Sequence, residues 1–253
     1  MLLYILFFAF APHPKYIETD VLNTFSLPSS QHLLGTDHLG RDVYALLAAG
    51  AFRTLEVVFL ATALSFLGGS FLGMLLGYFG GVWGSVIQFF ADFVSVLPSF
   101  LAAMALSALF GFSPLMAGVV FGVGNMGEYI NQAAVLTEGM KKQEFIDAQK
   151  VLGLGNFQIM LSHILPNIAR QLFVFMGNKA AGMVSLYAGL AFIGLGTDIT
   201  KPDWGTLLYQ YRGYLTSYPL LVFWPTLCIV CLTLCFHLLF DASEEEEEST
   251  LYD

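Results

Sequence analysis

The sequence predicts an all-α, polytopic transmembrane helical bundle, and three observations carry that prediction. Of the 253 residues, 57% are hydrophobic and only 11% are charged, against about a quarter charged in ordinary soluble domains. Apolar stretches close to the ~20 residues that cross a hydrocarbon core alternate with short polar stretches. The 25 glycines and nine prolines are tolerated in membrane helices, because neighbouring helices satisfy the backbone groups that kinks release. We therefore expect a multi-pass protein of the cell membrane.

Hydropathy divides the chain into about five to six spans. The predicted spans cover residues 54–79, 86–110, 115–126, 168–195 and 215–240, of which the third is short for a helix that crosses a bilayer. Residues 1–11 are apolar but number about half of the ~20 required, so we interpret them as the remnant of a first transmembrane helix. Residues 12–48 are polar and rich in turn residues, which predicts an external segment. The transmembrane domain then occupies 49–253.

Glycine and proline positions predict how these helices pack and bend. Gly69, Gly73 and Gly77 recur every four residues, so one face of the first complete span lacks side chains and another backbone can approach it. We favour helix packing over ligand contact for this stripe. Pro98 and Pro225 are expected to bend or interrupt their helices.

Charge and cysteine content exclude several functions. The net charge of −9 owes five acidic residues to the run 244–248, so we interpret 241–253 as a solvated acidic tail. Ten lysines and arginines provide no basic face for nucleic acid. Three cysteines within one apolar span behave as small hydrophobes, and the scattered histidines form no i, i+4 pair, so no metal site is expected. No catalytic constellation is present either.

A polar island at 128–166 interrupts the apolar pattern. Its first part, 138–152, has helical periodicity with apolar side chains on an otherwise polar surface. Gly153 and Gly155 predict a sharp turn, because glycine adopts positive φ freely. A second short helix is expected over 156–163, ending at Pro166. Such a helix-turn-helix at a membrane surface suits docking into a groove of another protein, although a merely solvated loop is the simpler interpretation.

Four segments resemble a known family. The island resembles the cytoplasmic coupling loop of ABC-importer permeases, with Asp147-Ala148-Gln149, Gly153 and Leu165-Pro166 at the family's spacings. The segment 31–43, QHLLGTDHLGRDV, looks like the LGTDxxGRD signature of the peptide and nickel permeases. Asp92 followed by Pro98, and the 192–196 segment FIGLG followed by Pro202, Trp204 and Gly205, look like two further landmarks. The resemblance covers nearly the whole chain.

This resemblance implies the type I ABC-importer permease fold and a set of partners. A second homologous permease subunit, two ATP-binding subunits, an extracytoplasmic substrate-binding protein and membrane lipid would complete the importer. No G-x-x-x-x-G-K-[ST] phosphate loop occurs in the sequence, so ATP and its magnesium would be bound by the partner subunits, and this chain would be a translocation subunit without enzymatic activity.

The resemblance also assigns roles within the island. Apolar side chains, Phe145 among them, would enter a groove of the ATPase, Glu144 and Asp147 would make polar contacts beside them, and Gly153 would form the elbow. The full set of expected coupling residues is Glu144, Phe145, Asp147, Ala148, Leu152 and Gly153. Gln149 replaces an alanine of the family pattern, and the stretch GNMGEYINQAA replaces an arginine-rich one, so docking is expected to be tuned differently.

Orientation does not follow from charge. Lysines and arginines are balanced between the two sides, four on each, so the positive-inside rule gives no orientation. The cytoplasmic placement of the island rests on the family resemblance alone.

Lys179 lies about 20 Å along a helix from Pro166, near the middle of the membrane. A charge at this depth costs roughly 2.5–3.5 kcal/mol on insertion scales, so it should face the bundle interior or a watery path. Together with Asn178 it is our candidate for the translocation path, with a preference for ligands that carry a carboxylate. The alternative is a lysine that pairs with a carbonyl or extends towards the interface.

The ligand and the transport class complete the expectations. The 31–43 segment looks slightly closer to nickel permeases, whereas Lys179 suits a peptide carboxylate or an anionic chelate; we favour nickel or its chelate, with a dipeptide or oligopeptide as the alternative. A secondary, ion-coupled transporter would carry carboxylates deep in its spans, for which Asp92 and Glu56 are the candidates. A membrane-embedded protein without an ATPase partner is the remaining alternative.

Overall fold

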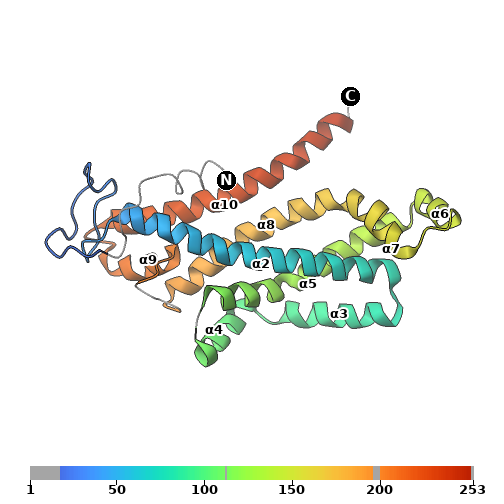
Figure 1. The fold of residues 1–253 in the computed structure, drawn as a ribbon, viewed down its shortest axis with the longest axis horizontal. Coiled ribbons are helices and arrows are strands. Elements are labelled where there is room, and N and C mark those ends of the chain that lie inside the picture. The colour runs from blue at the N-terminus through green and yellow to red at the C-terminus, as the bar shows by residue number, and fades with distance from the viewer. Residues whose placement is uncertain (1–17, 112, 196–199, 252–253) are drawn as a thin grey trace. The chain divides into compact units, whose positions relative to one another are not determined.

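Most of the chain that the structure describes is helical, and residues 18–42 form turns and irregular segments ahead of the first described helix. The computed structural model describes residues 18–111, 113–195 and 200–251, with only the backbone described over 241–251. The helices are α2 (Val43–Phe79), α3 (Gly81–Val96), α4 (Ser99–Phe110), α5 (Pro114–Lys141), α6 (Glu144–Val151), α7 (Asn156–Ile159), the π-helix η1 (Met160–Ile164), α8 (Leu165–Phe192), α9 (Trp204–Tyr211), the 3₁₀ turn η2 (Arg212–Tyr214) and α10 (Pro219–Leu251) (Figure 1). The predicted all-α class is confirmed. The predicted remnant at 1–11 lies outside the described residues.

The apolar helices match the predicted spans with shifted boundaries. Among the described residues, α2, the continuous helical segment Asn156–Phe192 and the first 22 residues of α10 are long and apolar enough to cross a membrane, and the pair α3 and α4 makes a fourth if counted as one broken span. α5 has 28 residues and is long enough as well, but it is more polar than these helices and is not one of them. α2 begins at Val43 rather than at residue 54, because the preceding polar segment turns directly into the helix.

Proline has different effects at three positions. α3 and α4 are bent by 77° at a break that contains Pro98, as the sequence predicts. Pro225 lies inside α10 without interrupting it, so that interruption is not found. The expected helix end at Pro166 is wrong: the helix runs without a break from Asn156 to Phe192. Pro166 comes directly after the π-helical turn Met160–Ile164 and Leu165, where the regular hydrogen-bond pattern of an α-helix is already altered.

The chain forms two compact units. The first comprises Met1–Val58, Met104–Ala117 and Ala180–Leu239, and the second comprises Phe59–Ala103, Gly118–Lys179 and Phe240–Asp253. We call them the 43–58/α9 unit and the island unit, after the segments that carry their functional features.

In the island unit the glycine stripe of α2 packs against α5. A Cβ at Gly69 would stand 2.8 Å from the backbone oxygen of Met126, and a Cβ at Gly73 or Gly77 would collide with the backbone oxygen of Ile130 or Ala134. The helices can approach this closely only because these side chains are absent. The predicted packing role of the stripe is confirmed.

The 43–58/α9 unit has an aromatic core around α9. Trp204 is fully buried and donates its indole N–H to the backbone oxygen of Leu47, 2.9 Å away. Asp203 caps α9 by accepting a hydrogen bond from the backbone N–H of Thr206. Gly205 packs against Ala188 of α8 with no room for a side chain. These contacts hold the start of α2, α8 and α9 together within the unit.

Candidate functional site

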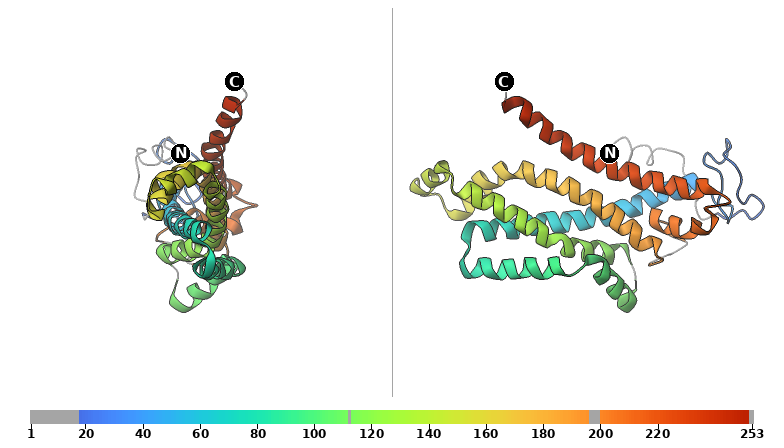
Figure 2. Two further views of the ribbon diagram at one scale, coloured as in Figure 1. Left: turned by 90° about the vertical axis from the view of Figure 1, so that its right-hand side faces the viewer. Right: turned by 180° about the vertical axis from the view of Figure 1, so that it is seen from behind.

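The polar island folds into two short helices joined by a tight turn. The chain breaks after α5 at Lys142 and Gln143, then forms α6, a four-residue turn and α7. The single exposed helix expected over 138–152 is therefore wrong, because α5 ends at Lys141. Figure 1 shows α6 and α7 together at one end of the island unit, where α5 ends and α8 begins, and the view from behind in Figure 2 shows the same pair. We call residues 144–164 the elbow.

Glycine at position 153 ends α6 in the way the sequence predicts. Gly153 has a φ of 84°, a value that L residues rarely adopt. Its N–H donates to the oxygen of Lys150, and the N–H of Leu154 donates to the oxygen of Gln149, which is the Schellman pattern of helix termination. Gly155 differs: its φ is −70°, so the expected need for glycine at that position is not found.

The expected coupling residues all lie on the exposed surface of the elbow. Glu144, Asp147 and Ala148 are exposed, and so are Phe145 and Leu152, at 41% and 72%. The most exposed apolar side chain of α6 is Val151, at 88%, which was not among the expected coupling residues. Exposed apolar residues continue beyond the turn. The exposed apolar surface of the elbow consists of Phe145, Val151, Leu152, Phe157 and Leu161.

The opposite side of the elbow is anchored to the island unit. Ile146 is fully buried and packs in a cluster with Ile159, Met160 and Ile164 of α7 and η1, and with Met74 of α2. Sequence reasoning missed Ile146, although its apolar neighbours ten to twenty residues later were visible. The elbow is thus a packed element with one apolar face turned outward.

Polar contacts reinforce this anchoring. The hydroxyl of Tyr78 donates to the side-chain oxygen of Asn156 over 3.0 Å, and the ammonium of Lys141 donates to the backbone oxygen of Tyr78 over 2.6 Å. On α6, Lys150 and Asp147 form an ion pair of 2.7 Å, and the hydrogen bond to Asp147 raises the pKa of Lys150. Tyr78 therefore holds both the end of α5 and the start of α7.

Lys179 forms an ion pair with Glu128 of α5. Its partner is thus a carboxylate rather than a backbone carbonyl, and the side chain does not extend towards a helix end. The ammonium of Lys179 also lies 5.3 Å from the centre of the Phe175 ring, one helical turn earlier. Asn178 is exposed beside it. The sequence analysis did not identify Glu128 as the partner.

Further polar side chains lie along the same face of α5. Asn131, one turn after Glu128, accepts a hydrogen bond of 3.1 Å from Gln88 of α3, whose amide also donates to Asp92 over 2.8 Å. Glu128, Asn131, Gln88 and Asp92 are all part of the exposed surface of the island unit or border it. We call these residues together with Lys179 the polar strip.

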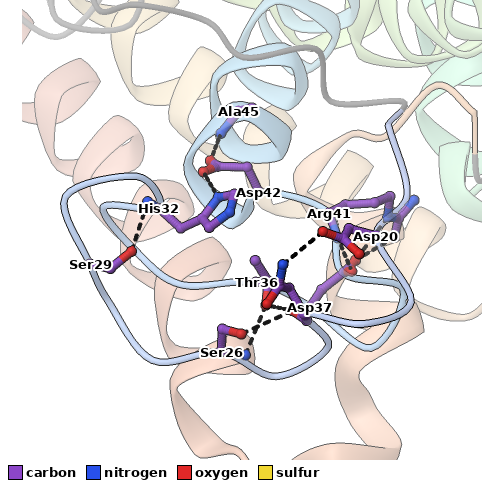
Figure 3. A network of polar contacts seen from close by, with 10 residues as sticks. Asp20, Ser26, Ser29, His32, Thr36, Asp37, Arg41, Asp42 and Ala45 are labelled. Atoms are coloured by element: carbon purple, nitrogen blue, oxygen red, sulfur yellow. Dashed lines mark hydrogen bonds and ion pairs between the residues drawn. The ribbon is translucent and has the colours of Figure 1, made fainter.

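The segment with the LGTDHLGRD motif forms a network within the 43–58/α9 unit (Figure 3). Asp37 is fully buried and accepts hydrogen bonds from the backbone N–H groups of Leu39 and Arg41 and from the Arg41 side chain, at 2.7–3.0 Å. Arg41 also donates to the side-chain oxygen of Gln210 in α9 over 2.7 Å. Asp42 caps α2 by accepting from the backbone N–H of Ala45, and it pairs with His32 at 2.8 Å. The motif therefore fixes the start of α2 against α9.

Residues 69–246 match the family model of the binding-protein-dependent transport system inner membrane component. The chain belongs to this family. It is a multi-pass inner-membrane permease subunit of the ABC-importer class, as the four resembling segments predict.

Relatives across bacteria share most of the permease. It is 32% identical over 244 residues to the dipeptide transport system permease protein DppC of Alkalihalophilus pseudofirmus, covering 94% of this chain and 79% of that protein. It is 31% identical over 231 residues to the glutathione transport system permease protein GsiD of Pectobacterium atrosepticum, covering 90% of this chain and 75% of that protein.

Solved structures agree with the fold of the permease. A chain of the inward-facing MetNI methionine ABC transporter superposes with a TM-score of 0.59 at 17% identity, over 78% of this chain and 94% of that one. At this identity the likeness concerns the fold alone. It confirms the predicted type I ABC-importer architecture.

Proposed function

We propose that this permease imports peptides, driven by ATP-binding subunits that grip the elbow. The observation that carries the proposal is the elbow's geometry: one face packed into the helices of the island unit through Ile146, the other an exposed apolar surface. A surface of this kind suits a groove in a partner, and aromatic and aliphatic anchors supply most of the affinity of such contacts.

The elbow is also placed to transmit a push. α7, η1 and α8 form one continuous helical segment, Asn156–Phe192, of 37 residues. Movement of a docked ATPase would therefore reach Lys179 without crossing a loop. The proposed roles are apolar anchors for Phe145, Val151 and Leu152, polar contacts for Glu144 and Asp147 beside Ala148, and a fixed turn at Gly153.

The relatives support a peptide rather than nickel as the ligand. DppC and GsiD are named for dipeptide and glutathione, both small molecules with an ammonium and a carboxylate, and the polar strip carries both signs of charge. The sequence-based preference for nickel or its chelate has no support from these relatives, so we propose a dipeptide or a glutathione-like peptide in its place.

The proposed assembly follows the family pattern. A second, homologous permease would complete the bundle in the lipid membrane, two ATP-binding subunits would carry ATP and magnesium, and an extracytoplasmic binding protein would deliver the peptide. No contact with nucleic acid is proposed.

Uptake by the reconstituted importer tests the proposal. The complete complex, purified through a tag on this chain, should retain an ATP-binding subunit and accumulate labelled dipeptide in proteoliposomes only when hydrolysable ATP is supplied. Uptake driven by a proton or sodium gradient without ATP would identify a secondary transporter. Accumulation of labelled nickel but of no peptide would overturn the proposed ligand class.

A further inference from the structure

Glu128 and Lys179 both lie well inside their helices. Glu128 stands 14 residues after the start of α5 and 13 before its end at Lys141, and Lys179 stands 13 residues before the end of α8 at Phe192. Both charges therefore lie at mid-helix, far from the ends where long side chains reach the interface. The segment Asn156–Phe192, which carries Lys179, is long and apolar enough to cross a membrane, so we place the pair at membrane depth.

The pair remains accessible despite this depth. The side chains of Lys179 and Glu128 are 31% and 47% exposed within this chain, whereas an ion pair that serves only to join two helices can be enclosed between them. The Phe175 ring lies 5.3 Å from the Lys179 ammonium. Asn131 follows Glu128 on the same face of α5, and its side-chain oxygen accepts a hydrogen bond from Gln88 of α3. A ligand that moves along this face meets an anion, a cation and amide groups.

We propose that Glu128 and Lys179 form a recognition site for the two charged ends of a zwitterionic peptide, and that they neutralise each other while the site is empty. This inference rests on the proposed function. Lys179 would bind the terminal carboxylate and Glu128 the terminal ammonium. In the absence of ligand each residue compensates the other, so neither charge stands alone inside the membrane.

Charge compensation makes such a site selective. A ligand with both charges can separate the pair and leave every charge with a partner. A ligand with only a carboxylate would pair with Lys179 and leave the charge of Glu128 uncompensated. A ligand with only an ammonium would pair with Glu128 and leave the charge of Lys179 uncompensated. Because an uncompensated charge away from water is strongly unfavourable, the empty pair discriminates against ligands with a single charge.

Ligand binding without the receptor tests the site directly. The complex of permease and ATP-binding subunits is reconstituted without the binding protein, and labelled dialanine is displaced by dialanine, N-acetyl-dialanine or dialanine amide. For the unaltered protein, dialanine should compete at least roughly tenfold better than either derivative, which is the scale of losing one charge partner. Equal competition by all three peptides, or no specific binding at all, would overturn the inference.

Single substitutions assign each end. Lys179→Met should make dialanine and its amide equally effective while N-acetyl-dialanine remains weak, and Glu128→Gln should have the reverse effect. If both substitutions weaken all three peptides in parallel, the pair only joins α5 and α8. The exchange variant Glu128→Lys with Lys179→Glu retains one charge of each sign, so it should bind dialanine within a few-fold of the unaltered protein.

A second ion pair, between Glu138 of α5 and Lys142 just beyond its end, provides the matched control. Lys142 and Glu138 pair at 2.8 Å near the end of the helix, and both are largely exposed. Glu138→Gln should leave the ratios among the three peptides unchanged. ATP-dependent uptake by the complete importer keeps the two proposals separate. If the importer takes up peptide but the complex without the binding protein does not bind dialanine, only the proposed site is wrong. If the importer takes up no peptide, the proposed function is wrong.

Discussion

At the scale of single residues, burial changes the pKa of His38 in the polar segment before α2. His38 stacks on Tyr214 with ring centres 5.3 Å apart, faces Tyr211 edge-on and lies 3.9 Å from the Asp37 carboxylate. Its Nδ1 is buried without a hydrogen-bond partner. Burial lowers the pKa of His38 from 6.5; the Asp37 charge opposes this shift and the Arg41 charge adds to it.

The lowered pKa of His38 gives the segment a pH dependence. The unfolded chain takes up a proton near pH 6.5 and the folded chain only below that, so the unfolded state binds more protons in between and stability falls as the pH drops below about 6.5. His38→Gln should reduce the difference between melting temperatures measured at pH 7.5 and pH 5.5 in detergent. An unchanged difference would show that other groups dominate.

Gly153 and Gly155 form a matched pair for testing the elbow's turn. A Cβ at either position would meet nothing within 4 Å, so alanine tests backbone conformation alone. Gly153→Ala forces an L residue to a φ of 84°, at a cost of about 1–2 kcal/mol, and should reduce ATP-dependent uptake. Gly155→Ala, at a φ of −70°, should leave uptake near that of the unaltered protein. Similar losses from both would contradict this account.

At the scale of elements, the apolar surface of the elbow is exposed and is separate from the buried cluster around Ile146. Phe145→Ala removes an exposed aromatic side chain while the buried anchor Ile146 stays in place. If Phe145 fills a pocket of the ATPase, we expect a loss of about 2 kcal/mol, roughly 30-fold in the affinity of the ATP-binding subunit. Titration of that subunit onto the permease in nanodiscs measures it.

A conservative control accompanies this measurement. Ser162 is exposed on η1, outside the apolar surface of the elbow, and Ser162→Ala should leave the affinity unchanged. If Phe145→Ala also leaves it unchanged, the partner does not dock through this residue.

The contact between α2 and α5 is a second element that can be tested. Gly73→Val adds side-chain atoms where the backbone oxygen of Ile130 already stands, so we expect a destabilisation of about 1–3 kcal/mol from overpacking. Thermal unfolding in detergent should show a lower midpoint. Gly139→Ala on α5, with nothing within 4 Å of the added Cβ, should not lower it. A tolerated Gly73→Val would mean that the helices can separate without loss.

At the scale of the whole molecule, helical phase connects the elbow with the polar strip. One residue inserted into an α-helix rotates everything beyond it by about 100°. An alanine inserted between Leu172 and Phe173 should therefore leave binding of the ATP-binding subunit intact but abolish dipeptide uptake, because Lys179 then no longer faces Glu128. Preserved uptake would show that transport does not depend on the orientation of Lys179 relative to the elbow.

Much of this architecture could be predicted from local chemistry. The 3.6-residue period, the glycine stripe and the positive φ at Gly153 depend on near neighbours in the sequence, and each was predictable. The pairing of Glu128 with Lys179, the anchor Ile146 and the contacts of Arg41 with Gln210 join residues far apart in the chain, and one sequence contains no signal for them. Pro166 misled because it lies inside a continuous helix, next to a π turn that alters the local hydrogen-bond pattern, and the sequence does not show such a turn.

The π-helix at Met160–Ile164 affects the helical phase between the elbow and Lys179. A π turn holds one residue more than an α turn, and it behaves as an extra residue accommodated inside a regular helix. Deleting a single residue there, unlike anywhere else between Asn156 and Phe192, should convert the wide turn to an ordinary one and leave both flanks facing as before. The extra residue can therefore be lost without a change in helical phase. A chain shortened within Met160–Ile164 should keep the orientation of the elbow's apolar surface relative to Lys179.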